Sequence, residues 1–87
     1  MPYPNEHAAR QLDPKQFKRF ARSSRNFPKG VSAIIGWLPN GKSKIQSLRF
    51  NIRYWSADQA RRWLRKHGYK SNIEEATSKN ISWGSVL

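Results

Sequence analysis

The residues best suited to acid–base or recognition chemistry lie together near the N-terminus, in the stretch PYPNEHAAR. Asn5, Glu6, His7 and Arg10 form a compact polar cluster there, and histidine and glutamate are common general acids and bases. No nucleophile or metal partner accompanies them in the sequence. The simpler interpretation is a capped turn whose His7 and Arg10 hydrogen-bond the body of the domain. The cluster is therefore a secondary candidate site, and an enzyme centred on His7 is a minor alternative.

Catalysis and metal binding find little other support in the sequence. The chain has two histidines, five acidic residues and no cysteine, whereas a zinc site needs several such ligands close together. It has neither a glycine-rich phosphate loop nor a nucleophile elbow. His67 lies on the apolar side of a predicted helix, where we expect a packed or helix-end histidine. We therefore expect a non-enzymatic protein that uses no metal and no cofactor.

Positive charge is the strongest signal in the sequence. Seventeen lysines and arginines face five acidic residues, which gives a formal net charge of +12 on 87 residues. No acidic residue lies between Asp13 and Asp58. Such a field attracts polyanions, among them nucleic acids, acidic proteins and anionic lipids. The residues predicted to bind such a partner are Lys15, Lys18, Arg19, Arg22, Arg25, Arg49, Arg53, Arg61, Arg62, Arg65 and Lys66.

Nucleic acid, or a nucleoprotein complex, is the partner that this pattern favours. Lysines and arginines bind phosphates and confer affinity and salt dependence without reading base sequence. An acidic protein explains the same charge, so that alternative stays open, as do the choice between DNA and RNA and the oligomeric state. No apolar run approaches the roughly 18 residues of a membrane span, and the N-terminus lacks a signal-peptide pattern. We therefore expect neither a membrane span nor export.

The N-terminal part of the chain predicts helical structure. The segment NEHAARQL, residues 5–12, is compatible with one or two helical turns capped by its asparagine. The following Asp-Pro pair predicts a helix over residues 13–24, because aspartate is a good N-cap and proline suits the first helical position. Phe17 and Phe20 share an apolar stripe on this helix, and basic residues cover the rest of its surface.

A β-hairpin is predicted in the middle of the chain. Residues 31–38 form an apolar, β-rich run, an Asn-Gly pair follows, and residues 48–54 alternate between apolar and polar side chains. Asn-Gly is the strongest short-range signal for a hairpin turn. The alternation predicts that Arg49 and Arg53 stand on the face opposite to the buried apolar residues.

A second helix is predicted after the hairpin. Ser56 is its N-cap and Gln59 completes a capping box. Gly68 is a helix-ending residue in the left-handed conformation, and Tyr69 is placed to fold back on the last turn. A short strand is expected around Ile73.

The predicted order is α-β-β-α-β. It describes an α+β fold in which a small antiparallel sheet, made of the hairpin and a short third strand, packs with two helices. A chain of 87 residues fits one domain, which we place at residues 1–76. Residues 77–87 are expected to be a C-terminal arm or tail with Trp83 as its anchor.

Two blocks of the sequence resemble a small domain of tailed-phage and prophage proteins. They are P-N-E-H-A-A-R and W-S-A-D-Q-A-R-R-W-L-R-K-H, with L-D-P and S-L-R-F between them, and the resemblance extends over residues 2–76. That domain is associated with head-morphogenesis genes, including those of prohead proteases. The resemblance implies a phage origin and action in the cytoplasm of the bacterial host or in the virion. This chain is unusually basic for the pattern and carries the extension SKNISWGSVL.

Three roles fit a basic phage protein of this kind. The leading expectation is a binding protein that engages nucleic acid or a nucleoprotein complex through lysine- and arginine-rich helix faces. The second is an inhibitor of a host defence system, similar to an anti-CRISPR, that acts by protein–protein contact. The third is a structural protein of the virion or head.

Overall fold

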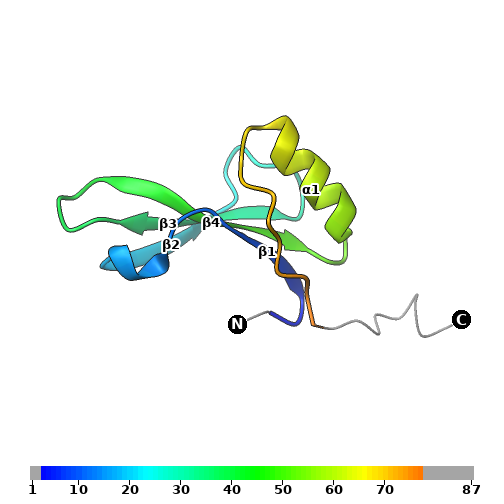
Figure 1. Cartoon of the computed structure of the whole chain (residues 1–87), viewed down its shortest axis with the longest axis horizontal. Helices are drawn as coiled ribbons and strands as arrows, with labels where there is room; N and C mark the ends of the chain where they lie inside the picture. Colours follow the sequence, from blue (N-terminus) through cyan, green and yellow to red (C-terminus); the bar gives the residue numbers. More distant parts are fainter. Residues whose placement is uncertain (1–2, 78–87) are drawn as a thin grey trace, which may run out of the picture.

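The computed structural model describes residues 3–77 and contains a four-stranded antiparallel sheet with one α-helix against one of its faces (Figure 1). The strand order in the sheet is β1-β4-β3-β2. The elements along the chain are β1 (Glu6–Arg10), the short 3-10 helix η1 (Pro14–Gln16), β2 (Arg19–Ser23), β3 (Val31–Trp37), β4 (Ser43–Asn51) and α1 (Ala57–Lys66). The predicted α+β class is confirmed. The predicted tail lies, from residue 78 onwards, outside the described residues, and so does Trp83.

The predicted hairpin is confirmed as β3 and β4, which form the centre of the sheet. The return strand β4 ends at Asn51, so the placement of Arg53 on the outer face of this strand is wrong, and Arg53 lies in the turn that follows. At the base of the hairpin, Val31 lies opposite Phe50. Its loop differs from a two-residue Asn-Gly turn, because the Gly41 N–H donates to the Leu38 carbonyl and, within the loop, only Gly41 has a positive φ, of 89°. Asn40 therefore occupies an ordinary turn position, and glycine takes the left-handed one.

The helices predicted over residues 5–12 and 13–24 are wrong. The first segment contains β1, and the second contains only η1 followed by β2. Asp13 does act as an N-cap, since its side chain accepts a hydrogen bond from the Lys15 N–H at 2.9 Å, but the helix stops at Gln16. Each outer edge of the hairpin pairs with one of these segments. That tertiary pairing outweighs a weak local helix preference.

The observed element order is therefore four strands followed by one α-helix, rather than α-β-β-α-β. The strand expected around Ile73 is reduced to an isolated bridge between Ala8 and Glu74. The backbone groups of these two residues exchange hydrogen bonds of 2.9 and 2.8 Å. The segment after α1 thus lies along the outer edge of β1.

The predicted second helix is confirmed as α1, including both of its end signals. Ser56 and Gln59 form the reciprocal capping box. Gly68 has a φ of 80°, and the Tyr69 N–H donates to the Leu64 carbonyl at 2.9 Å. No helix among residues 3–77 is long and apolar enough to cross a bilayer.

The core lies between α1 and the base of the hairpin. Leu48 and Phe50 from β4 and Leu64 from α1 are fully buried. Trp63 packs against this cluster and meets the Phe50 ring edge-on at 5.8 Å. The helix covers only this end of the sheet, and the turn end of the hairpin projects away from it (Figure 1). We call the projecting part, residues 14–20 and 36–44, the arm.

Gly36 makes room on the arm for an aromatic ring. A Cβ at this position would lie 2.4 Å from the Phe17 ring, which therefore rests directly on the strand backbone. Phe17 is 8% exposed. Phe20 lies opposite Gly36 in the register of β2 and β3, and its ring meets that of Phe17 edge-on at 5.8 Å.

Replacing Gly36 with alanine should lower the free energy of unfolding by about 1–3 kcal/mol, because the added methyl group displaces the Phe17 ring. Truncating that ring removes the clash. The double variant with Phe17→Ala should therefore lose less stability than the two single variants together. Urea titration followed by tryptophan fluorescence measures all three.

The matched control is Gly41→Ala, where no atom lies within 4 Å of the added Cβ and the strain arises from the positive φ alone. Its effect should add to that of Phe17→Ala. If the stability losses of Gly36→Ala and Phe17→Ala also added up in the double variant, this result would contradict the contact between Gly36 and the Phe17 ring.

Candidate functional site

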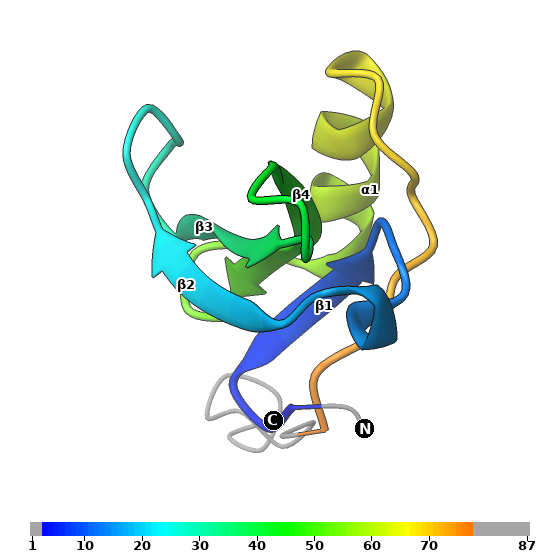
Figure 2. The ribbon, with the colours of Figure 1, turned by 90° about the vertical axis from the view of Figure 1, so that its left-hand side faces the viewer.

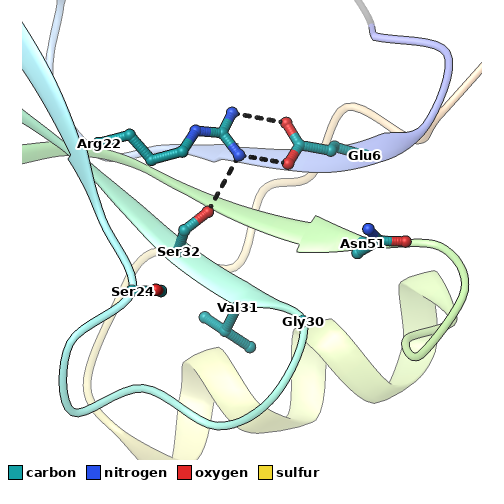
Figure 3. Close-up of a pocket in the computed structure, with 7 residues that line it drawn as sticks. All are labelled: Glu6, Arg22, Ser24, Gly30, Val31, Ser32 and Asn51. Carbon is teal, nitrogen blue, oxygen red and sulfur yellow. Dashed lines mark hydrogen bonds and ion pairs between the residues drawn. The ribbon is translucent and has the colours of Figure 1, made fainter.

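Glu6, at the start of β1, is the centre of a polar network on the sheet face away from α1 (Figure 3). Its carboxylate accepts two hydrogen bonds from the Arg22 guanidinium, at 2.6 and 2.9 Å, and lies 3.5 Å from that of Arg49. Arg22 also donates to the Ser32 hydroxyl at 3.2 Å. Arg49 stacks 4.0 Å from the Tyr3 ring centre and donates to the Tyr3 hydroxyl. The network joins β1, β2, β3 and β4.

This network fixes the charge state of Glu6. The pKa of Glu6 lies below its ordinary value of 4.5, chiefly because Arg22 donates hydrogen bonds to the carboxylate, and the charges of Arg22 and Arg49 reinforce the effect against the influence of burial. The carboxylate is therefore ionised at neutral pH. The Arg49 side chain, predicted to stand on the outer face, does lie on the face away from α1 but is only 12% exposed. Arg22 and Arg49 thus both bind a carboxylate of the protein itself, that of Glu6.

A hollow of about 400 Å³ lies beside the network (Figure 3). The residues that line it are Glu6, Arg22, Ser24, Gly30, Val31, Ser32 and Asn51. Glu6, the acidic residue of this lining, already binds Arg22 and Arg49. The lining contains no histidine, cysteine or lysine. Among residues 3–77 no three histidine or acidic side chains gather closely enough to hold a metal ion. The hollow therefore offers hydrogen bonding but no acid–base pair.

His7 lies on the opposite face of β1 from Glu6, because successive side chains of a strand alternate. The His7 ring is buried, and its Nδ1 accepts a hydrogen bond from the Ala76 N–H at 2.9 Å. Burial lowers the pKa of His7 below its ordinary value of 6.5; the charge of Arg61 acts in the same direction, and Glu75 and the Trp55 backbone act against it. A neutral ring with its proton on Nε2 fits this bonding pattern.

The four residues of the predicted N-terminal cluster therefore do not converge. Glu6 and His7 point to opposite faces of β1, while Asn5 and Arg10, at either end of the strand, are exposed. The role of His7 visible in the structure is to tie residue 76 to β1. This arrangement matches the hydrogen-bonding role considered for His7 in the sequence.

The predicted binding residues separate into three sets. Arg22, Arg49 and Arg61 take carboxylate partners, Arg61 with Asp58 at 3.0 Å and Glu75 at 3.1 Å. A second set surrounds the exposed side of α1 and the loops beside it, and we call it the helix patch: Arg25, Arg53, Arg62, Arg65 and Lys66. The third set, Lys15, Lys18 and Arg19, lies on the arm. Together with Lys42 and Lys44, two exposed lysines of the same arm, it forms what we call the arm patch. No residue of either patch forms an ion pair within the part of the chain that the structure describes.

Ring contacts and strand pairing show where the two patches lie in the fold. The loop that carries Arg25 reaches α1 through Phe27, whose ring centre lies 6.2 Å from that of Trp63. On the arm, Trp37 lies opposite both Arg19 and Ser43, so the start of β2 and the start of β4 lie on either side of the end of β3. The basic residues predicted on a first helix thus lie on β2, on the arm and in the loop after β2, whereas Arg62, Arg65 and Lys66 remain on the confirmed helix α1 at the other end of the sheet (Figure 1).

Lys42 and Lys44 were missing from the residues predicted to bind. They follow the Asn-Gly turn, and pairing puts Lys44 opposite Gly36, on the same face of the sheet as Phe20 and on the other side of β3. Their position after a hairpin signal, in a stretch without acidic residues, is the sequence feature that points to them. A basic residue beyond such a turn belongs to the same end of the sheet as the residues before it.

Exposed aromatic rings accompany both patches. Phe20 on the arm is 46% exposed and Tyr54, beside the helix patch, 45%. The Arg19 guanidinium lies 4.2 Å from the ring centre of Trp37, and the Lys29 ammonium 4.8 Å from that of Tyr54. The two ends of the molecule therefore present cations and aromatic rings together.

Glu6→Gln should lower the free energy of unfolding by about 1–2 kcal/mol, because it removes the charge that Arg22 and Arg49 bind. The loss is smaller than for a buried ion pair, because Arg22 is half-exposed and solvent screens its charge. The depressed pKa of Glu6 stabilises the fold above the ordinary value of 4.5, and this contribution disappears as the pH falls through the lower folded value. The variant should therefore lose less stability than the wild type in that acid range. Urea titrations across that range measure both effects.

Glu74→Gln is the control, because the Glu74 carboxylate forms no ion pair within residues 3–77. An equal loss of stability in Glu74→Gln would contradict the role of Glu6.

His7→Gln should remove a pH dependence of stability at milder acidity. Since the folded pKa of His7 is depressed, the unfolded chain binds more protons below 6.5, and the wild type loses stability as the pH falls from there towards the folded value. Thermal unfolding at about pH 7.5 and about pH 5.5 measures this loss. His67→Gln, at the exposed end of α1, should keep the wild-type loss. An unchanged loss in His7→Gln would exclude His7 as its source.

Comparisons of the chain with protein-family models, with curated proteins and with solved structures returned no match. The ligand of the site is therefore inferred from the charges, contacts and exposed rings of its own residues.

Proposed function

We propose that this chain is a small, non-enzymatic binding protein that engages nucleic acid, or a nucleoprotein complex, through the arm patch and the helix patch. The observation that carries the proposal is the segregation of charge in the fold. The carboxylates of Glu6, Asp58 and Glu75 are bound by arginines. The cations of the two patches have no carboxylate partner among residues 3–77, and phosphates are the groups that such cations bind with strong salt dependence.

The position of the remaining acidic groups supports the same proposal. Asp13 caps η1, and the backbone of Glu74 pairs with that of Ala8 on the outer edge of β1. Glu6, Glu74 and Glu75 thus lie on β1 or on the segment beside it, Asp58 lies on α1, and Asp13 lies next to the arm. No acidic residue lies on β2, on β3 or in the loop between them. A polyanion that approaches from the β2 side meets little repulsion.

Aromatic rings favour nucleic acid over an acidic protein or an anionic lipid surface. Exposed Phe20 lies among the cations of the arm patch, and a ring in such surroundings stacks on bases while cations bind the backbone. The resemblance of the sequence to a domain of phage head-morphogenesis genes is consistent with a protein that meets nucleic acid in the infected cell or in the virion.

Neutralising the arm patch with Lys15→Gln, Lys42→Gln and Lys44→Gln should weaken binding to a labelled oligonucleotide. The slope of log affinity against log salt should become shallower by up to about 2–3, because each lost phosphate contact removes about 0.7–0.9. Arg62→Gln, Arg65→Gln and Lys66→Gln test the helix patch in the same way. Arg61 is left intact because it binds Asp58 and Glu75. Fluorescence anisotropy across a salt series measures each variant.

The matched control neutralises Arg10 and Lys70, two exposed cations near the outer edge of β1, and should change the slope little. Absence of wild-type binding at about 50 mM salt would overturn the proposal. Affinity capture from host lysate with and without nuclease distinguishes the alternatives. A specific protein retained after nuclease treatment would instead support an inhibitor of a host factor.

A further inference from the structure

Phe20 is an exposed aromatic ring that has no cation stacked on it within the described residues. Three large apolar side chains are exposed in the structure of residues 3–77: Tyr3, Phe20 and Tyr54. The Arg49 guanidinium lies over the ring of Tyr3, and the Lys29 ammonium over that of Tyr54. Phe20 makes its ring contact with Phe17 instead. An apolar ring left 46% exposed on a strand gains most from burial against a partner.

The surroundings of Phe20 hold its ring in place. Phe17 rests on Gly36, where no side chain intervenes, and meets Phe20 edge-on at 5.8 Å with 67° between the ring planes. Phe17 is itself fixed, because its N–H donates to the Pro14 carbonyl and the next N–H, of Lys18, donates to Trp37. A ring that is ordered before binding loses little conformational freedom when it stacks.

Two cations stand near this ring. Gly36 lies opposite Phe20 on one side and opposite Lys44 on the other. Residues opposite one another share a face of the sheet, and neighbouring strands are about 4.8 Å apart, so Lys44 starts about 10 Å from Phe20 on the same face. Lys18 precedes Phe20 by two positions in the chain. The ring therefore has cations on two sides.

We infer that Phe20 stacks on a base of single-stranded nucleic acid, while Lys18 and Lys44 bind the flanking phosphates. This inference rests on the proposed function and specifies its ligand. In a duplex the faces of the bases are already stacked on one another, whereas a single strand leaves them free for an aromatic side chain. The arm should accordingly prefer single strands to duplexes, with little dependence on base sequence because every base has a π-face.

The test compares twelve-nucleotide oligo(dT), oligo(rU) and a duplex of the same length on the full chain by fluorescence anisotropy. Phe20→Ala should weaken binding of the single strands by about 5- to 150-fold, which corresponds to the usual contribution of one stacked ring. It should change duplex affinity less than twofold. Equal losses for oligo(dT) and oligo(rU) would assign the site to single strands in general, and a loss for one alone would assign it to that polymer.

Two further variants separate stacking from folding. Phe20→Leu keeps an apolar side chain on the arm but has no aromatic face, so it should show the same loss as Phe20→Ala, whereas Phe20→Tyr should bind as the wild type does. Tyr54→Ala is the matched control, because Tyr54 is equally exposed but already carries Lys29, and it should retain single-strand affinity.

The outcomes also separate this inference from the proposed function. Full single-strand affinity in Phe20→Leu, or an equal loss for duplex and single strands in Phe20→Ala, would overturn the stacking site while leaving nucleic-acid binding in place. Failure of the wild type to bind any of the three oligonucleotides would overturn both.

Discussion

The contact between Glu6 and Arg22 ties together strands that the sheet itself keeps apart. It joins the two edge strands, β1 and β2, which are separated by β4 and β3 in the order of the sheet. The edge strands approach each other over the open face because the sheet is strongly twisted, and Figure 2 shows them crossing. Without the carboxylate, the guanidinium groups of Arg22 and Arg49 would face each other above two buried serines, Ser32 and Ser47, to which they also donate hydrogen bonds. Glu6 thus offsets a repulsion that the high positive charge of the chain makes costly.

The same contact decides which cations remain available to a partner. Glu6 binds two arginines, and Asp58 and Glu75 bind a third, Arg61. The scarce carboxylates are therefore placed where the fold needs them, on the β1 side and along α1. The arm and the exposed side of α1 are left cationic. In a chain with a net charge of +12, the placement of a few acidic residues shapes the surface potential as much as that of the many basic ones.

Aromatic residues serve two different purposes in this small fold. At the base of the hairpin, Phe50, Trp55 and Trp63 meet edge-on and enlarge the core that α1 covers. On the arm, beyond the reach of the helix, Phe17 packs on the backbone at Gly36 and Phe20 packs against Phe17, which leaves the Phe20 ring in contact with solvent. The arm therefore obtains its order from a local aromatic pair rather than from the main core.

Elements whose signals are local could be predicted from the sequence. The hairpin follows from alternation and an Asn-Gly pair, and α1 follows from its capping box and from Gly68. The ends of α1 were predicted correctly, whereas β4 begins and ends earlier in the chain than the predicted residues 48–54. The strands β1 and β2 were predicted as helices, because EHAAR and RFARS carry weak local signals and become strands only by pairing with the hairpin edges. The candidate site, too, could be predicted only in part from the sequence. Its basic character was evident in the sequence, but alternation along β1 separated Glu6 from His7, and pairing on both sides of β3 placed Lys44 and Phe20 on the same face of the sheet. Contacts between residues distant in the chain decided which charges are bound within the fold and which remain exposed.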